Sequence, residues 1–269
     1  MNPQLSLISE LPEGFFNLDV GRIRDLFPTP TLVQLAGDKS PALFVSILLH
    51  GNEYSGLKSM QLLLAKYRER LPRSIYLFIG NVAAAEKSRR VLPGQDDFNR
   101  CWPGTEMSEN GTTRLMQQVM DIVNQADLFA AIDLHNNTGT SPHYACMTKV
   151  TQDNQQLAAM FNHIALVFER PKGVSTMAFD PLCPALTLEC GRPGEEAGIH
   201  HAAELLDGLL HMDHIPQRPV AHQDLQLVKS LVTVNISDQV SFEFNLSADA
   251  DLTFGEDFAF KNFTEFNTT

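Results

Sequence analysis

Two strand-like runs of the chain end in side chains that can bind a metal ion. Residues 42–49 (ALFVSILL) lead into HGNE, in which His50 and Glu53 are three apart, and residues 128–134 (LFAAIDL) lead into His135. The carboxyl ends of parallel strands form one edge of a sheet, where such sheets place their ligand sites. Two His and one Glu with a free fourth position form the ligand set of catalytic zinc. The pattern predicts one Zn²⁺ per chain, although a Glu at a helix start also occurs for dipole reasons alone.

A third strand-like run ends in a carboxylate. Residues 185–188 (ALTL) are followed by Glu189, Cys190 and Gly191. A carboxylate near a metal can take a proton from water and pass it to a leaving amine. Glu189 alone would equally cap the turn before GRPGEE. The coincidence of three strand ends favours a catalytic role.

Arginines are concentrated in one loop of this acidic chain. Arg89 and Arg90 precede DDFNR, which contains Asn99 and Arg100. Because Arg binds a carboxylate through two parallel hydrogen bonds, Asn99 and Arg100 are candidates for holding an anionic substrate. Arg90 or Arg89 is the candidate for stabilising a developing oxyanion. A solvated loop with local ion pairs is the alternative.

Elements that position these residues follow from the hydrophobic pattern. Strand-like runs at 42–49, 74–79, 128–134 and 185–188 alternate with helical spacing at 53–70, 112–124, 154–167 and 195–210. Strands and helices in alternation predict an α/β fold, with a mostly parallel or mixed central sheet flanked by helices.

The pattern changes after residue 215. From residue 216 onward the chain has no helical spacing but has short alternating stretches, LQLVKSLVTVNI, QVSFEFNL and DFAFKNF. These predict a small antiparallel β module. We therefore expect a catalytic domain over residues 1–215 and a β-rich module over residues 216–269.

Composition and charge exclude several classes of protein. The 269 residues are 43% apolar, and 20 Lys and Arg against 32 Asp and Glu give a net charge of −12. Such a charge repels nucleic acids and anionic membranes, so neither is an expected partner. No leader-like segment or apolar run of membrane-spanning length occurs, which predicts a cytoplasmic protein. The four cysteines form no CxxC pair and are expected to be reduced.

The ordered motifs HGNE, GNVAAAEKSRR…DDFNRCWPG, DLHNNTG and LTLECG resemble those of the succinylglutamate desuccinylase and aspartoacylase family. Members of that family are zinc hydrolases with a carboxypeptidase A-like fold. The resemblance covers about residues 43–191, and the late β-rich segment is similar to the family's C-terminal module. The roles it implies are zinc binding for His50, Glu53 and His135, proton transfer for Glu189, carboxylate binding for Asn99 and Arg100, orientation of a zinc-binding His for Asp97, and electrophilic assistance for Arg90 in preference to Arg89.

Two departures from the family pattern bear on the substrate. Aspartoacylases carry an Arg about ten residues before the catalytic Glu, whereas residues 173–188 contain none, and the C-terminal module contains no Tyr. We therefore expect a neutral acyl group. The predicted activity is zinc-dependent hydrolysis of the amide bond of an N-acyl amino acid or a related small amide. The alternatives are a metallocarboxypeptidase acting on short peptides and a non-catalytic zinc-binding protein.

Overall fold

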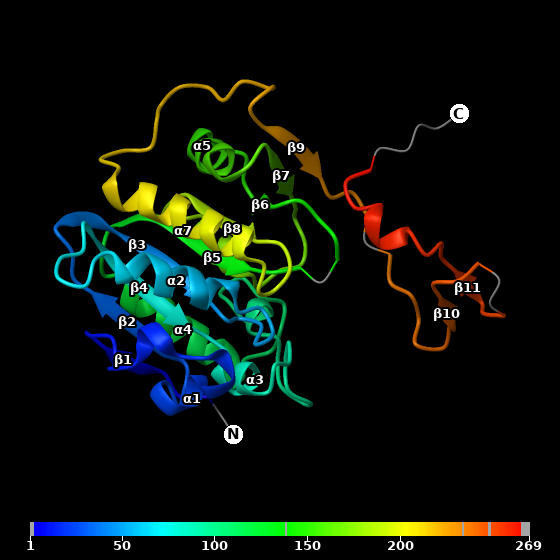
Figure 1. Cartoon of the computed structure of the whole chain (residues 1–269), viewed down its shortest axis with the longest axis horizontal. Coiled ribbons are helices and arrows are strands. Elements are labelled where there is room, and N and C mark those ends of the chain that lie inside the picture. Colours follow the sequence, from blue (N-terminus) through cyan, green and yellow to red (C-terminus); the bar gives the residue numbers. More distant parts are fainter. Residues whose placement is uncertain (1–2, 138, 233, 247–248, 265–269) are drawn as a thin grey trace.

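The computed structural model describes residues 3–137, 139–232, 234–246 and 249–264. Nine strands of these ranges form one sheet (Figure 1), in the order β1-β2-β4-β3-β5-β8-β6-β7-β9. Neighbouring strands run parallel except in the pairs β2–β4 and β6–β8. Their bounds are β1 Ser6–Ile8, β2 Thr31–Leu35, β3 Lys39–Ile47, β4 Arg73–Ile79, β5 Leu128–His135, β6 Tyr144–Met147, β7 Ile164–Val167, β8 Ala185–Glu189 and β9 Gln226–Lys229.

Helices cover both faces of this sheet. Their bounds are α1 Ile23–Leu26, α2 Ser55–Ala65, α3 Val82–Glu86, α4 Gly111–Val123, α5 Gln152–Phe161, α6 Ser175–Phe179 and α7 Glu196–His211. Side chains of β3 alternate between the faces: Leu43, Val45 and Ile47 belong to the core beneath α2, α5 and α7, and Phe44 to the core beneath α4 and α6. In Figure 1, α2 and α7 lie in front of the sheet and α4 behind it. The predicted α/β class with helices on a mixed sheet is confirmed.

The predicted elements differ from the structure in a few places. The predicted helix over residues 53–70 is shorter, since α2 covers Ser55–Ala65. The predicted helix over residues 154–167 is wrong beyond Phe161, because Asn162 adopts an extended conformation and Ile164–Val167 is strand β7. These four residues pair with β6 on one side and β9 on the other. Tertiary pairing thus overrides the apparent helical spacing.

The predicted small β module after residue 215 is confirmed as a two-stranded sheet, but its predicted antiparallel pairing is wrong. Strand β9 adds to the edge of the main sheet, parallel to β7. The short strands β10 (Phe242–Glu243) and β11 (Leu252–Thr253) also pair parallel. Without β9, strand β7 would be the edge of the sheet and would expose unpaired backbone groups. Strand β9 pairs with these groups. The division at residues 215 and 216 stays a prediction.

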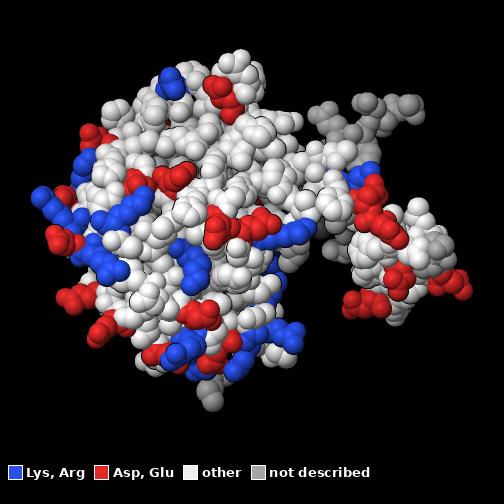
Figure 2. Space-filling model, in the orientation of Figure 1, with Lys and Arg blue, Asp and Glu red and all other residues white. Residues whose placement is uncertain are grey.

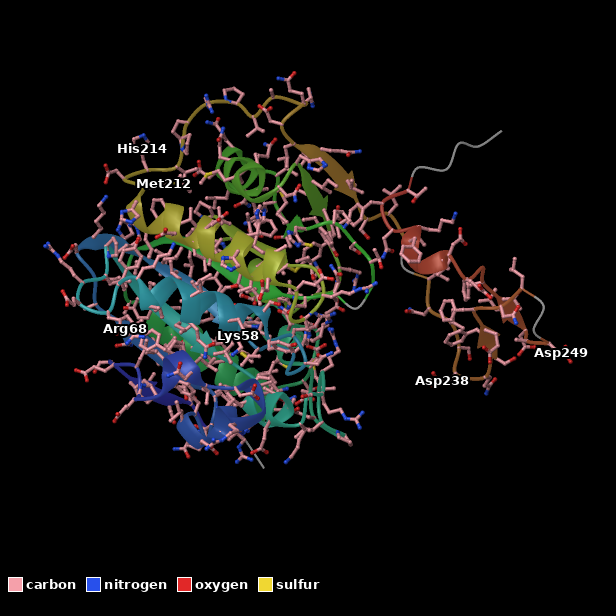
Figure 3. The ribbon with its side chains drawn as sticks, viewed as in Figure 1. Lys58, Arg68, Met212, His214, Asp238 and Asp249 are labelled. Carbon is pink, nitrogen blue, oxygen red and sulfur yellow. The ribbon has the colours of Figure 1, made fainter. Side chains whose placement is uncertain are left out.

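The C-terminal segment lies to one side of the main body (Figure 1). Asp238 and Asp249 are at its far end from the sheet (Figure 3). Among the charged side chains on the visible face of this segment, most are acidic, whereas both signs of charge are interspersed on the main body (Figure 2). In the described part of the chain, no helix has the length and hydropathy needed to cross a membrane.

Candidate active site

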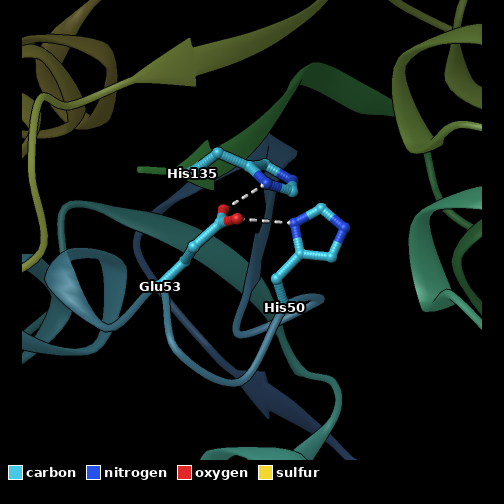
Figure 4. Close-up of side chains that lie close together, drawn as sticks. All are labelled: His50, Glu53 and His135. Atoms are coloured by element: carbon cyan, nitrogen blue, oxygen red, sulfur yellow. Dashed lines mark hydrogen bonds and ion pairs between the residues drawn. The ribbon is translucent and has the colours of Figure 1, made fainter. Parts of the chain in front are cut away.

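The carboxyl ends of strands β3 and β5 bring three potential metal ligands together. His50 lies three residues beyond the end of β3, Glu53 lies two residues before α2, and His135 ends the neighbouring strand β5. A turn in which the Glu53 N–H donates to the His50 carbonyl, at 3.1 Å, returns Glu53 toward the sheet. One ligand atom from each of the three buried side chains lies within 4.8 Å of the others (Figure 4).

The turn after β3 depends on a close backbone approach. A Cβ added to Gly51 would lie 2.2 Å from the Ala85 backbone nitrogen in α3, so no larger residue fits there. The Gly51 N–H also donates to the Arg90 carbonyl at 3.1 Å. The HGNE motif and the arginine loop are therefore fixed to each other by the backbone.

Both histidines turn the same nitrogen toward Glu53. The Nδ1 atom of His50 lies 2.9 Å from Glu53 Oε1, and that of His135 lies 2.8 Å from Glu53 Oε2. Their outer Nε2 atoms face carboxylates, at 3.0 Å from Asp97 Oδ1 and 2.7 Å from Asp133 Oδ2. Such outer carboxylates fix the tautomer and orientation of metal-binding histidines.

This arrangement fits a bound cation. A carboxylate accepts hydrogen bonds only, so each outer Nε2 donates, and each ring offers a lone pair at Nδ1 once any proton there is lost. These lone pairs face the Glu53 oxygens, and the buried His50 Nδ1 has no hydrogen-bond partner among the described residues. Burial opposes charge on His135, but Asp133 and Glu53 outweigh it and raise the pKa of its imidazole well above the usual value. Two imidazole nitrogens and a carboxylate oxygen are donors that zinc accepts.

Glu189 lies at the adjacent strand end. It is the last residue of β8 and pairs in register with His135 of β5. Its Oε2 atom is buried without a hydrogen-bond partner in the described chain. Burial raises the pKa of this carboxyl to about 7; the charge of His135 opposes the shift, and those of Glu53 and Asp133 add to it. A pKa near neutrality suits a group that both takes and gives a proton.

The two arginines of the RR pair occupy different environments. The Arg90 guanidinium lies 3.1 Å from Glu53 Oε1 and 3.2 Å from Asp97 Oδ2, at the wall of the cavity. Arg89 is exposed and is not among the residues that line this cavity. Arg90 is thus the member of the pair that faces the candidate site.

Asn99 and Arg100 line the same cavity, but their side chains differ in how many hydrogen bonds they make to the protein. The Asn99 amide oxygen accepts from the Ser175 N–H at 2.9 Å, and its Nδ2 donates to Asp133 Oδ2 at 3.4 Å. Asn99 is therefore held by the protein itself. Arg100 donates from Nη1 to the Asn99 carbonyl, and burial lowers the pKa of its guanidinium. An anionic partner would offset that burial.

The cavity extends from the polar cluster to an apolar wall. Its volume is about 360 Å³. Away from the histidines it is lined by Cys146, Leu166, Phe168 and Val174. Arg170 lies at its rim, where its side chain is 70% exposed and 3.0 Å from Glu106. The apolar part of the lining is thus suited to a neutral group.

The catalytic-domain sequence model of the succinylglutamate desuccinylase/aspartoacylase family matches residues 39–212, about two thirds of the chain. The chain belongs to this family. Family membership makes it a hydrolase of the desuccinylase and aspartoacylase type, in agreement with the four ordered motifs. No curated protein matches the sequence.

Solved structures of similar fold include succinylglutamate desuccinylases. Succinylglutamate desuccinylase from Chromobacterium violaceum is 20% identical, with a TM-score of 0.62, and the superposition includes 81% of this chain and 75% of that protein. The Vibrio parahaemolyticus enzyme is 15% identical, with a TM-score of 0.63 and coverage of 81% and 71%. The product-bound ectoine utilization protein EutE from Ruegeria pomeroyi is 18% identical, with a TM-score of 0.55 and coverage of 74% and 64%. At these identities the likeness concerns the fold.

Several residues of this desuccinylase-family site were not predicted from the sequence. Asp133 supports His135, and its Oδ1 accepts from the Ser46 hydroxyl at 2.7 Å. The signal for Asp133 was a charged residue within an apolar strand, two positions before His135 and so on the same face. Asn137 also lines the cavity. It comes from the loop after His135, and no spacing rule singles it out.

Proposed function

We propose that this family member is a zinc-dependent hydrolase that cleaves the amide bond of a small N-acyl amino acid. The observation that carries the proposal is the Glu189 carboxyl, with an unpartnered oxygen and a pKa of about 7, beside the cluster of His50, Glu53 and His135. This cluster would hold the zinc ion. Zinc, when bound, polarises a carbonyl group and acidifies water.

Glu189 would move the protons of the reaction. Its carboxylate takes one proton from water as the water oxygen forms a bond to the carbonyl carbon of the amide. The carbon–nitrogen bond then breaks, and the protonated Glu189 gives its proton to the leaving nitrogen. One water is consumed, and a carboxylic acid and an amine are released.

The arginines would bind the negative charges of the substrate. Arg90 lies at the cavity wall, where its guanidinium can face the carbonyl oxygen as charge develops on it. Arg100 is the candidate for the α-carboxylate of the amino acid. Among the described residues its partly buried guanidinium donates one hydrogen bond, from Nη1 to the Asn99 carbonyl, so its other N–H groups are available to a ligand. Asn99 would act by holding Asp133, the carboxylate that supports His135, and the Ser175 backbone rather than by binding substrate directly.

A substrate panel tests the proposal. Zinc-loaded protein is incubated with N-acetyl and N-succinyl amino acids and with dipeptides, and release of primary amine is followed. We expect hydrolysis of N-acyl amino acids, and none by a Glu189→Gln control. Faster hydrolysis of dipeptides would favour the carboxypeptidase alternative, and no hydrolysis of any member by zinc-loaded protein would contradict the proposal.

A further inference from the structure

Asn137 presents a free amide to the cavity. Neither its Oδ1 nor its Nδ2 is exposed to solvent, and neither has a hydrogen-bond partner in the described ranges. The side chain lines the cavity together with the three potential ligands and Glu189. Burial raises the pKa of the nearby Tyr144 hydroxyl, and the Asn137 amide opposes that rise, but no hydrogen bond of adequate geometry joins the two side chains in the described ranges. Buried polar groups of proteins are almost always paired, so this exception needs a cause.

The neighbouring amide shows what a structural asparagine looks like here. Asn136 donates from Nδ2 to the Ser55 hydroxyl and the Gly191 carbonyl, both at 2.9 Å. Its Oδ1 accepts from the Ser55 N–H at the start of α2, at 3.1 Å. Asn136 therefore joins β5 to α2 and to the end of β8. Asn137, one residue further on, contributes no such bond.

The Asn137 backbone is nevertheless fixed. Its N–H donates to the Gly191 carbonyl at 3.2 Å, directly beyond the paired residues His135 and Glu189. Gly191 has a φ of +72°, a conformation that glycine adopts without strain. The protein thus holds Asn137 beside the candidate catalytic carboxylate, and no other described residue pairs with its amide.

A primary amide offers an acceptor and a donor side by side. In the amino-acid half of an N-acyl amino acid, the amide N–H and a carboxylate oxygen lie close together on one edge and present the complementary donor and acceptor. We propose that Asn137 is a specificity-determining residue that binds this edge, with Oδ1 accepting from the N–H of the scissile amide and Nδ2 donating to the α-carboxylate. The inference rests on the proposed function and adds to it a requirement for a secondary amide.

The test compares an amide with the matching ester. N-acetyl-L-alanine has the N–H, and O-acetyl-L-lactate has an oxygen in its place. Each is measured with wild-type protein and with Asn137→Leu, both loaded with zinc, as kcat/KM. The ratio between the two proteins cancels the different intrinsic reactivities of amide and ester.

We expect Asn137→Leu to lower kcat/KM about 100-fold for the amide and about tenfold for the ester, at about tenfold for each hydrogen bond lost. A merely structural role would lower both values equally. Equal losses for amide and ester, or no loss for the amide, would overturn the inference. Hydrolysis of neither substrate by the wild-type protein would instead contradict the proposed function.

Thermal unfolding gives a second readout that needs no activity. Because the Asn137 side chain makes no hydrogen bond within the described part of the chain, Asn137→Leu should unfold at the wild-type temperature or above it. Asn136→Leu is the matched control and should unfold about 4 °C lower or more, since three hydrogen bonds are removed. If Asn137→Leu were destabilised as much as Asn136→Leu, Asn137 would be structural and the inference would fall.

Discussion

Replacing Asp133 by asparagine should weaken zinc binding without touching any of the three ligands. The Asp133 carboxylate accepts from His135 Nε2 at 2.7 Å, and its side chain is only 2% exposed. A hydrogen bond to a charged group is worth about 1.5–3 kcal/mol, and about 1.4 kcal/mol corresponds to a tenfold change. Asp133→Asn is therefore expected to raise the Kd for zinc about 10- to 100-fold, in the range seen when such outer partners of metal-binding histidines are removed.

Asp97 provides an internal comparison. It supports His50 in the same manner, but at 3.0 Å and with a side chain that is 23% exposed. Water screens this pair more than the buried one, so Asp97→Asn should weaken zinc binding less than Asp133→Asn does.

Competition with a chromophoric zinc chelator measures these constants. The control is Asp96→Asn, because Asp96 precedes Asp97 in the chain but accepts from the Thr112 hydroxyl, away from the cluster. Far-ultraviolet circular dichroism checks that each variant is folded. A Kd of Asp133→Asn within twofold of the Asp96→Asn value would refute the assignment of His135 as a ligand supported by Asp133.

Glu189→Gln should bind zinc normally and lose turnover by about 100-fold or more, the usual contribution of a general acid and base; near-normal turnover would remove Glu189 from the reaction. N-acetyl amino acids should be better substrates than N-succinyl ones, because a buried carboxylate without a cationic partner costs several kcal/mol. A preference for the succinyl group that disappears in Arg170→Ala would show that Arg170 turns inward. Burial and the Asp207 carboxylate raise the pKa of Tyr67 to about 12, above its value of about 10 in the unfolded chain. The stability that this tyrosine contributes is complete below pH 10 and is lost as the pH rises toward 12, so the difference in unfolding free energy between wild type and Tyr67→Phe should shrink over that window. A difference independent of pH would contradict this reasoning.

The strand-end reasoning predicted which side chains meet. His50, Glu53 and His135 belong to two neighbouring parallel strands and their following turns, and the sheet brings them within 4.8 Å. Glu189 ends β8, the strand next to β5, so the sheet brings it to the same edge as His135. The hydrophobic periodicity of a sequence indicates its strands and helices. In an α/β sheet the ligand site then lies at the carboxyl ends of those strands.

The roles of individual side chains depended on contacts that the sequence does not carry. Asn99 is held by the backbone of Ser175, 76 residues later, so its predicted role in carboxylate binding passes in our proposal to Arg100 alone. Residues 164–167 form a strand because β6 and β9 flank them, although their spacing also suits a helix. In both cases long-range packing decides between two locally acceptable alternatives.

Zinc titration combined with an assay of amide hydrolysis tests whether one bound zinc ion per chain is required for the reaction. Protein freed of metal with a chelator is reloaded with increasing amounts of zinc, and cleavage of an N-acetyl amino acid is measured at each ratio. We expect no cleavage without zinc. The cleavage rate should rise linearly with added zinc and level off at about one zinc per chain, and Glu189→Gln should bind the same amount of zinc but remain inactive. Cleavage by the metal-free protein, or stoichiometric zinc binding by a variant that lacks both His50 and His135, would contradict this account.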